Sequence, residues 1–159
     1  MVMKLKKLNN KLLIGRFEWC ALSELKIPII KAKIDTGAKT SAIHAFDIEK
    51  VKLKGKYYAQ YKVHPVQGND EVIVKCRSLI IDERSIMSSN GHKENRFVIL
   101  TQLSLGGEHW PIELTLSNRD PLRFRLLLGR EALNHRVLID PALNCNQVKI
   151  NNKQVISFY

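Results

Sequence analysis

The tetrapeptide Asp35-Thr36-Gly37-Ala38 follows the apolar run at residues 27–34 and contains residue types that suit amide hydrolysis. An acid at the end of an apolar strand has its carboxyl in a dry, rigid place, and the glycine lets the backbone turn sharply beside it. Two carboxylates that share one proton can activate water and polarise a scissile carbonyl, because like charges about 3 Å apart do not both ionise. The alternative is an ordinary strand-ending turn, in which Asp, Thr and Gly are all favoured.

Strand-like apolar runs recur along the chain and predict the elements that position this turn. They are LLIGRFEWCAL, IPIIKAKI, YYAQYKVHPV, EVIVKCRSLII, RFVILTQLSL, HWPIELTL, FRLLLG and VLID, with turn residues between most of them. Such spacing predicts an all-β protein built on a mainly antiparallel sheet or a closed barrel. The segment GREALNH, residues 129–135, reads as one short helix, with Gly129 at its start and Glu131 in its first turn.

Glycine and asparagine pairs predict the hairpins. Asn90-Gly91 lies between strand-like runs and is the strongest short hairpin signal, because both residues tolerate positive φ. Gly106-Gly107 predicts a second hairpin in the same way. We expect residues 146–159 to form a terminal hairpin around Asn151-Asn152, and residues 1–12 to form a flexible basic arm.

Composition predicts one soluble domain with an anionic partner. The 159 residues suffice for a single core, and 45% hydrophobic with 26% charged residues is ordinary for a globular protein. A formal charge of +11 concentrates acidic ligands near the surface. The three widely spaced cysteines predict reduced thiols, and the absence of a long apolar run predicts a cytoplasmic protein without a membrane span.

Four segments in order carry a resemblance to retropepsin-type aspartic proteases: IPIIKAKIDTGAKTSAIHAFDIE, SSNGHKENRFVI, LGGEHWPIELTLSNRD and FRLLLGREAL. Within that class the chain resembles, from about residue 14 to 141, the bacterial family historically labelled ATP-dependent zinc proteases. The resemblance implies a retropepsin-like barrel in which Asp35 is the catalytic carboxylate and Gly37 leaves the backbone beside it unobstructed. Thr36 would brace the loop of a partner subunit, with Ala38 beside it.

The same resemblance implies roles for two further segments. Gly129 and Arg130 match the Gly-Arg of the retroviral pattern, in which Arg130 would stabilise the subunit contact; the alternative is a surface arginine at the start of a helix. Gly91 and its neighbours would form a flap over the substrate. The alternative is a polar hairpin tip.

The sequence contains one Asp-Thr-Gly, whereas the chemistry needs two carboxylates. A symmetric homodimer supplies both, because an isologous contact brings the same residue of two chains together on the two-fold axis. Asp140 in VLIDP is the rival within one chain, but an Asp-Pro after a strand usually starts a turn.

The zinc and ATP of the old family label find no support in the residues. Five histidines lie far apart without H-E-x-x-H or C-x-x-C spacing, so we predict no metal site, although a scattered three-ligand site stays open. The segment GAKT is no phosphate loop, because Ala38 separates Gly37 from Lys39. We therefore expect no cofactor.

Basic residues near the expected cleft predict an acidic substrate, since Arg and Lys pair well with carboxylates. The candidate substrate-binding residues are Lys39, His44, Asn90, Gly91, His92, Lys93, Arg119 and Arg123, with Arg96 and Arg125 nearby. The resembled family is associated with glutamate tails on a ribosomal protein, which implies an endopeptidase for oligoglutamate or glutamate-rich segments. The alternatives are a solvated charged face, a noncatalytic module that binds acidic proteins, and a ribosomal RNA binder; RNA ranks lower because aromatic residues make up only 7%.

Overall fold

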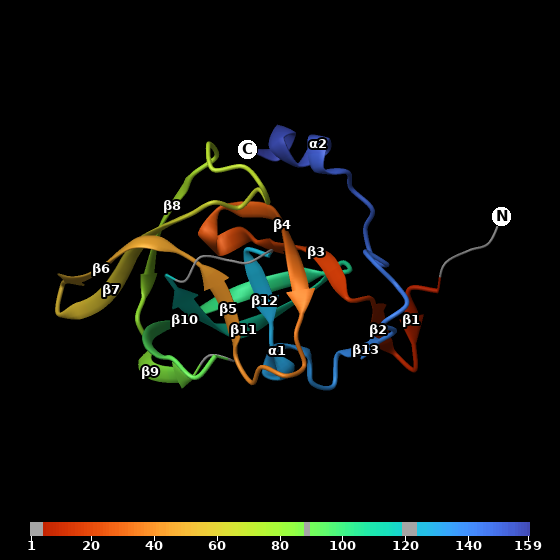
Figure 1. Cartoon of the computed structure of the whole chain (residues 1–159), viewed down its shortest axis with the longest axis horizontal. Helices are drawn as coiled ribbons and strands as arrows, with labels where there is room; N and C mark the ends of the chain where they lie inside the picture. Colours follow the sequence, from red (N-terminus) through yellow and green to blue (C-terminus); the bar gives the residue numbers. More distant parts are fainter. Residues whose placement is uncertain (1–4, 88–89, 119–123) are drawn as a thin grey trace.

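The computed structural model describes residues 5–87, 90–118 and 124–159, and the chain is mostly β-strand (Figure 1). The strands are β1 Lys7–Leu8, β2 Lys11–Ile14, β3 Phe17–Leu22, β4 Ile27–Ile34, β5 Ser41–His44, β6 Phe46–Leu53, β7 Lys56–Val63, β8 Val74–Leu79, β9 Asp82–Met87, β10 Lys93–Leu105, β11 Glu108–Ser117, β12 Leu126–Leu128 and β13 Val137–Ile139. The helices are η1 Ser23–Leu25, α1 Arg130–Leu133, α2 Asn152–Val155 and η2 Ile156–Phe158. The predicted all-β class is confirmed.

Six strands pair in a ring around the main core. Their order is β11-β5-β12-β4-β3-β10, and β10 pairs with both β3 and β11, so the ring returns to its first strand. Side chains such as Ile30, Ile43, Leu103, Leu114 and Leu126 point inside and have no exposed surface. Burial of this apolar surface is the main stabilising term of the fold.

The short strand β12 lies between β4 and β5, although these two strands are neighbours in the sequence. It runs parallel to β4, with Leu128 beside Ile34, and antiparallel to β5. Parallel strands end at the same edge of a sheet. The segments that leave β4 and β12, residues 35–38 and 129–130, therefore meet at one end of the barrel.

Two predicted hairpins are present. Strands β9 and β10 pair antiparallel from Met87 beside Lys93 back to Asp82 beside Val98, and Gly91 in the connection has φ of 84°. Gly106 and Gly107, with φ of 60° and 80°, join β10 to β11. Glycine adopts positive φ without the steric cost of a Cβ, so both turns depend on it.

A second sheet, of order β6-β7-β8, extends away from the barrel (Figure 1). Its first two strands turn at Lys54 and Gly55, which have φ of 49° and 80°. Strand β6 pairs with β7 on one side and forms the edge of this sheet.

The predicted flexible arm at residues 1–12 is wrong in its extent. Within the described residues, β1 and β2 form a sheet with β13, and Leu12 is 1% exposed. Lys7 also pairs with Glu108, Nζ to Oε1 at 2.6 Å. Leu12 and Ile14 belong to the core, and their burial outweighs the tendency of the neighbouring lysines to stay in solvent.

The predicted terminal hairpin at residues 146–159 is also wrong, because Asn151 begins the helix α2. Its side-chain oxygen accepts a hydrogen bond from the Gln154 amide at 2.9 Å, and the Gln154 side chain accepts one from the Asn151 amide. This reciprocal capping box satisfies two helix N–H groups. Val155 then packs with Trp19 and Ile29. The chain thus has helical turns besides the predicted one at α1.

Candidate active site

Asp35 lies directly after β4, at the barrel end where β4 and β12 finish. Its amide donates a hydrogen bond to the Leu128 carbonyl at 2.9 Å, and its carbonyl accepts one from the Ala38 amide at 3.2 Å. The Asp35 side chain is half-buried, and its Oδ1 accepts from the Gly37 amide at 3.1 Å. The carboxylate is therefore held by backbone contacts and remains accessible to solvent.

The space beside Asp35 explains why residue 37 is a glycine. A Cβ at this position would lie 3.2 Å from Asp35 Oδ1, so a larger residue would require the carboxylate to shift by a few tenths of an ångström. Thr36 is exposed, and its carbonyl accepts a hydrogen bond from Arg130. The predicted contact of Thr36 with a partner subunit stays a prediction.

Gly129 supports the turn from β12. A Cβ here would lie 2.8 Å from the Thr40 carbonyl carbon and 2.9 Å from the Ala38 oxygen, so only glycine fits without a backbone shift. The Gly129 amide donates to Ser41 Oγ at 3.0 Å. Gly129 therefore brings the two connecting segments into direct backbone contact.

Arg130 and the first turn of α1 hold the same loop. The Arg130 amide donates to the Ala38 carbonyl at 2.8 Å, and its guanidinium donates to the Thr36 carbonyl at 3.0 Å. The Glu131 amide donates to the Lys39 carbonyl at 3.1 Å. Within one chain Arg130 thus holds the loop that follows β4, a contact that its predicted role at a subunit interface did not include.

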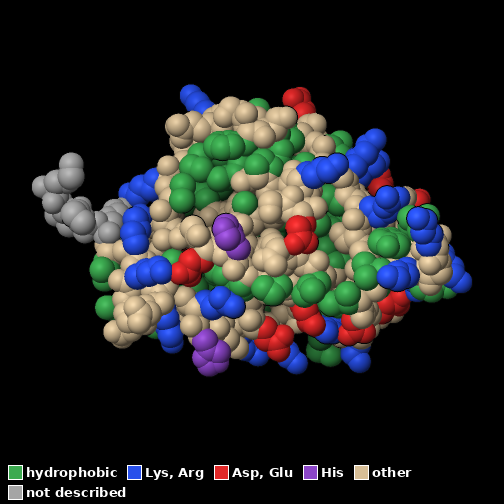
Figure 2. Space-filling view, turned by 180° about the vertical axis from the view of Figure 1, so that it is seen from behind, with side chains coloured by type: hydrophobic (Ala, Val, Ile, Leu, Met, Phe, Trp, Pro, Cys, Tyr) green, Lys and Arg blue, Asp and Glu red, His purple; other side chains and the backbone are tan. Residues whose placement is uncertain are grey.

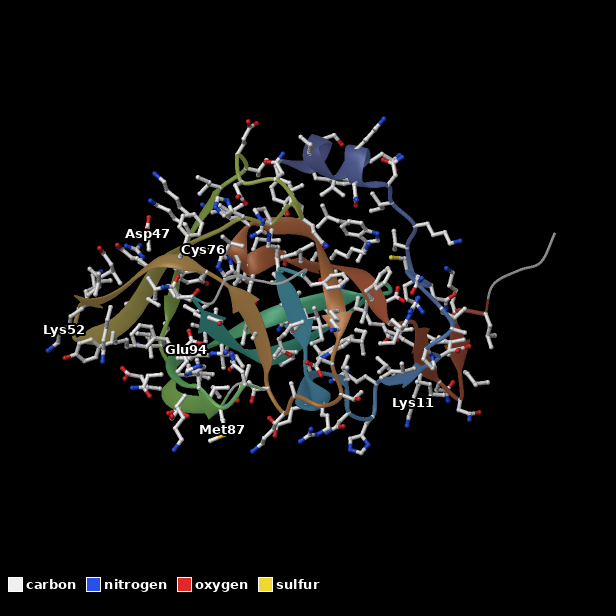
Figure 3. All side chains as sticks on the ribbon, viewed as in Figure 1. Lys11, Asp47, Lys52, Cys76, Met87 and Glu94 are labelled. Carbon is white, nitrogen blue, oxygen red and sulfur yellow. The ribbon has the colours of Figure 1, made fainter. Side chains whose placement is uncertain are left out.

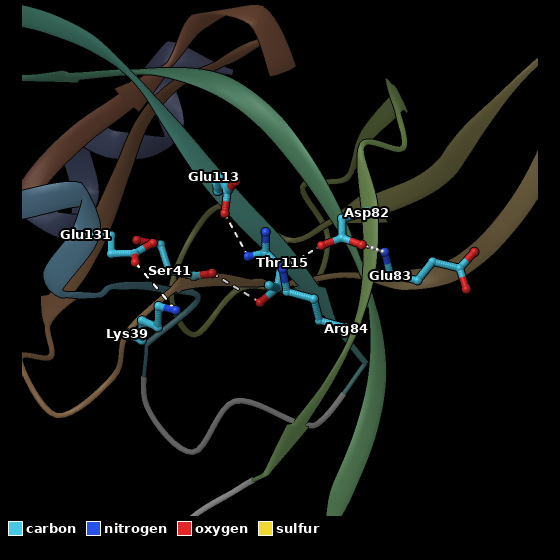
Figure 4. Close-up of polar contacts among 8 residues, drawn as sticks. All are labelled: Lys39, Ser41, Asp82, Glu83, Arg84, Glu113, Thr115 and Glu131. Carbon is cyan, nitrogen blue, oxygen red and sulfur yellow. Dashed lines mark hydrogen bonds and ion pairs between the residues drawn. The ribbon is translucent and has the colours of Figure 1, made fainter.

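Ser41 and Thr115 are positioning residues that the sequence did not indicate. Thr115 Oγ1 donates to the Ser41 carbonyl at 3.1 Å (Figure 4). Thr115 Oγ1 also accepts a hydrogen bond from Arg96 Nη1 at 3.4 Å. Since Ser41 Oγ accepts from Gly129, a continuous set of hydrogen bonds joins strand β10 to the catalytic turn. Isolated Ser and Thr residues carry no sequence motif, so only their positions in the barrel show this role.

The predicted basic residues differ in how open they are. Lys39 is exposed, with Nζ 3.8 Å from a Glu131 carboxylate oxygen (Figure 4). Arg96 is 11% exposed and pairs with Glu94 at 2.8 Å, while Arg125 pairs with Asp70 at 2.8 Å. Arg96 and Arg125 are thus partly neutralised by their own chain, which corrects the expectation that both offer free charge to a substrate.

The remaining predicted residues fall on β5 and on the β9–β10 hairpin. His44 is half-buried at the end of β5, and its amide donates to the Arg125 carbonyl at 2.9 Å. Asn90, Gly91 and His92 form the exposed hairpin connection, and exposed Lys93 begins β10. Arg119 and Arg123 lie outside the described residues.

Asp140, the rival carboxylate, forms a turn. Its Oδ1 accepts from the Ala142 amide at 2.9 Å, and its carbonyl accepts from the Leu143 amide at 3.1 Å. It follows β13, which belongs to the sheet of β1 and β2 and not to the ring. Its interpretation as a turn residue is therefore confirmed.

The described residues contain no cluster of three or more His, Cys, Asp or Glu side chains placed to hold a metal ion. No helix within residues 5–87, 90–118 or 124–159 has the length and apolarity to cross a membrane.

A family model described as "Retropepsin-like aspartic endopeptidase RimB" matches residues 13–150. The chain belongs to this RimB-like family. The resemblance that the sequence indicated is thus confirmed at the level of the family. The retropepsin-like fold is confirmed as well.

A solved structure shares the fold of this chain, and curated relatives that share its sequence carry a different name. A crystal structure of a Legionella pneumophila protein described as having unknown function superposes with a TM-score of 0.71 at 26% identity, over 86% of this chain and 98% of that one. Proteins named "Probable alpha-L-glutamate ligase" from Shewanella halifaxensis and Desulfotalea psychrophila are 44% and 46% identical over 95% and 94% of this chain. These matches cover 33% and 32% of the ligases, so the chain spans about a third of their length.

Proposed function

We propose that this RimB-like chain is an aspartic endopeptidase that works as a homodimer, with one Asp35 from each copy. The observation that carries the proposal is the Asp35 carboxylate itself, half-buried and held on a glycine turn at the open end of the barrel. Among the described residues, no second carboxylate is hydrogen-bonded to it. A two-fold axis beside this turn would supply the missing partner.

In the proposed mechanism the two Asp35 carboxyls share one proton. The ionised carboxylate takes a proton from water, and the water oxygen attacks the carbonyl carbon of the peptide bond. The protonated carboxyl donates to the carbonyl oxygen as negative charge develops there. The tetrahedral intermediate then breaks its C–N bond, and the proton taken from water leaves on the amine.

We propose acidic, glutamate-rich peptide tails as the substrate. Exposed Lys39 follows the catalytic turn and exposed Lys93 begins the second strand of the β9–β10 hairpin, so both cations can approach a bound peptide. The formal charge of +11 favours the same ligands. The name "Probable alpha-L-glutamate ligase" of the curated relatives supports this choice, because it refers to glutamate, the residue in which the proposed substrate is rich.

The experiment compares Asp35→Asn with Asp140→Asn on oligoglutamate and neutral peptides. Asp35→Asn removes the shared proton, so kcat/KM on oligoglutamate should fall by at least about a thousandfold. Asp140→Asn is the matched control, because Asn keeps the local turn and lies outside the proposed site. Full activity of Asp35→Asn would refute the peptidase, and equal turnover of both peptides would refute the substrate class.

A further inference from the structure

A groove runs beside the small β6-β7-β8 sheet and plays no part in the proposed chemistry. It has a volume of about 760 Å³ and lies between η1 and the three strands. The ionised residues that line it are Glu24, Lys26, Asp47, Glu49, Lys62, Lys75 and Arg77. Cys76 adds no charge at neutral pH, because burial raises the pKa of its thiol to about 11.

Three cations in this groove, Lys26, Lys75 and Arg77, form no ion pair among the described residues. Lys62 and Lys75 lie directly opposite each other across β7 and β8, a repulsive arrangement for like charges. Asp47 neutralises Lys62 at 2.9 Å. Within the described part of the chain, no ion pair joins Lys75 or Arg77 to an acid, and both are exposed on β8.

The spacing of these cations matches an extended peptide. Lys75 and Arg77 are two residues apart on one strand, so their side chains leave the same face about 6.7 Å apart. Alternate side chains of an extended ligand have the same separation. Lysine and arginine side chains gather at the end of the molecule that carries β6 and β7 (Figure 2).

A smaller depression adjoins this groove. It has a volume of about 490 Å³, and it shares Asp47 and Ile48 with the first groove while Glu94 and Asn118 line its other side. Glu94 lies between Asp47 and the hairpin-end residue Met87 in the view of Figure 3.

Glu94 also ties this depression to the strands of the active site. Its Oε1 accepts from the Asn118 amide at 3.1 Å, at the end of β11. There Ser117 pairs with His44, the last residue of the strand that follows the catalytic turn. The smaller depression therefore lies beside the end of β5 and shares two lining residues with the groove that contains Lys75 and Arg77.

We propose that this groove, defined by Lys26, Lys62, Lys75 and Arg77, is an exosite for the distal part of a long acidic peptide. The inference rests on the proposed function, because it assigns the far end of the same substrate. A peptide suits the groove better than RNA, since its only aromatic lining residue is Tyr61, which is 2% exposed and offers no surface for base stacking. Contact at both sites raises apparent affinity through effective concentration, so long chains should bind better than short ones.

The test compares KM for oligoglutamates of about six and about twenty residues, which extend to roughly 20 and 70 Å. For Lys75→Glu/Arg77→Glu, KM for the long chain should rise about tenfold, and KM for the short chain and kcat should stay unchanged. Lys149→Glu/Lys153→Glu is the matched control. It makes the same change of charge at exposed residues of the C-terminal segment and should leave both KM values unchanged.

Binding of the labelled long oligoglutamate to Asp35→Asn protein separates the exosite from the peptidase. Adding Lys75→Glu/Arg77→Glu to that protein should weaken binding about tenfold, whether or not the wild type cleaves peptides. The exosite is overturned if the control weakens binding equally, or if the β8 variant leaves KM and binding of the long chain unchanged. It is also overturned if the β8 variant weakens binding of a single-stranded RNA and not of the peptide.

Discussion

At the scale of single residues, the active site depends on close backbone approach more than on side-chain contacts. Within the described chain, the Asp35 side chain accepts a hydrogen bond from the Gly37 amide, and the Asp35 carbonyl accepts one from the Ala38 amide. The backbone of β12 and of α1 forms hydrogen bonds with the same turn. Gly129 is the point of closest approach, because a Cβ on this residue would lie within 3 Å of two carbonyl groups. Small changes here should alter catalysis before they alter the fold.

Gly129→Ala should lower both activity and stability. The new methyl would meet the Ala38 and Thr40 carbonyls, and relieving this contact should cost about 1–3 kcal/mol in the free energy of unfolding. Because the shift moves the loop that carries Asp35, kcat should fall more than the stability loss alone explains. Urea denaturation and peptide hydrolysis measure the two effects.

Gly55→Ala provides the control for that substitution. Gly55 has φ of 80° and open space around a Cβ, so alanine should cost about 1 kcal/mol through backbone strain. It lies at the far turn of the β6–β7 hairpin, and kcat on a short peptide should therefore stay at the wild-type value. Equal kcat losses in the two variants would show that Gly129 has no special place in the site.

At the scale of elements, the residue types of turns predicted secondary structure better than the distribution of charge did. Asn90-Gly91 and Gly106-Gly107 predicted real hairpins because positive φ is a local requirement of the turn. The prediction of a flexible basic arm at the N-terminus was wrong, because β2 pairs with β13, whose residues lie far along the sequence. At Asn151 the two asparagines suggested a hairpin, although Asn151 and Gln154 also have the spacing of a capping box.

In the candidate site, too, some residues could be predicted from local sequence, and others are recognised only from contacts in the folded chain. The positions of Asp35 and Gly129 at strand ends could be predicted, because each belongs to a short local motif, whereas the contact of Arg130 with the loop after β4 could not. Ser41 and Thr115 could not be predicted either, because β11 and β5 meet only in the folded barrel. The pairing of Arg96 with Glu94 similarly depends on their lying on one face of β10 and cannot be inferred from composition.

Glu18 joins the C-terminal segment to the barrel through hydrogen bonds. We therefore expect Glu18→Gln to destabilise the protein. Its buried carboxylate accepts hydrogen bonds from the amides of Gly15 and Asn146 at 2.8 Å and of Gln147 at 2.9 Å. An amide side chain would turn an NH₂ group toward one of these donors, so the free energy of unfolding should fall by about 3 kcal/mol. Chemical denaturation measures this loss, and Glu108→Gln, at an exposed ion pair, should change it by less than about 1 kcal/mol.

At the scale of the whole molecule, the proposal requires two chains for one active site. One chain supplies a complete barrel, a flap-like hairpin and one carboxylate, with the second carboxylate missing from the hydrogen bonds that the described residues make to Asp35. Because the shared element lies on a two-fold axis, the two subunits contribute equally to it. Activity should therefore depend on the composition of the dimer.

Mixing wild-type protein with an equal amount of Asp35→Asn distinguishes the dimer from a self-sufficient chain. If subunits exchange at random, about a quarter of the dimers contain two intact Asp35 residues, so activity should fall to about a quarter of that of the same total amount of wild type. Independent chains would retain about half. Mixing with Asp140→Asn instead should leave full activity, because that residue lies outside the shared site. A value of one half with Asp35→Asn, under conditions where tagged subunits demonstrably exchange, would mean that each chain completes its own site and that the second carboxylate must be sought within it.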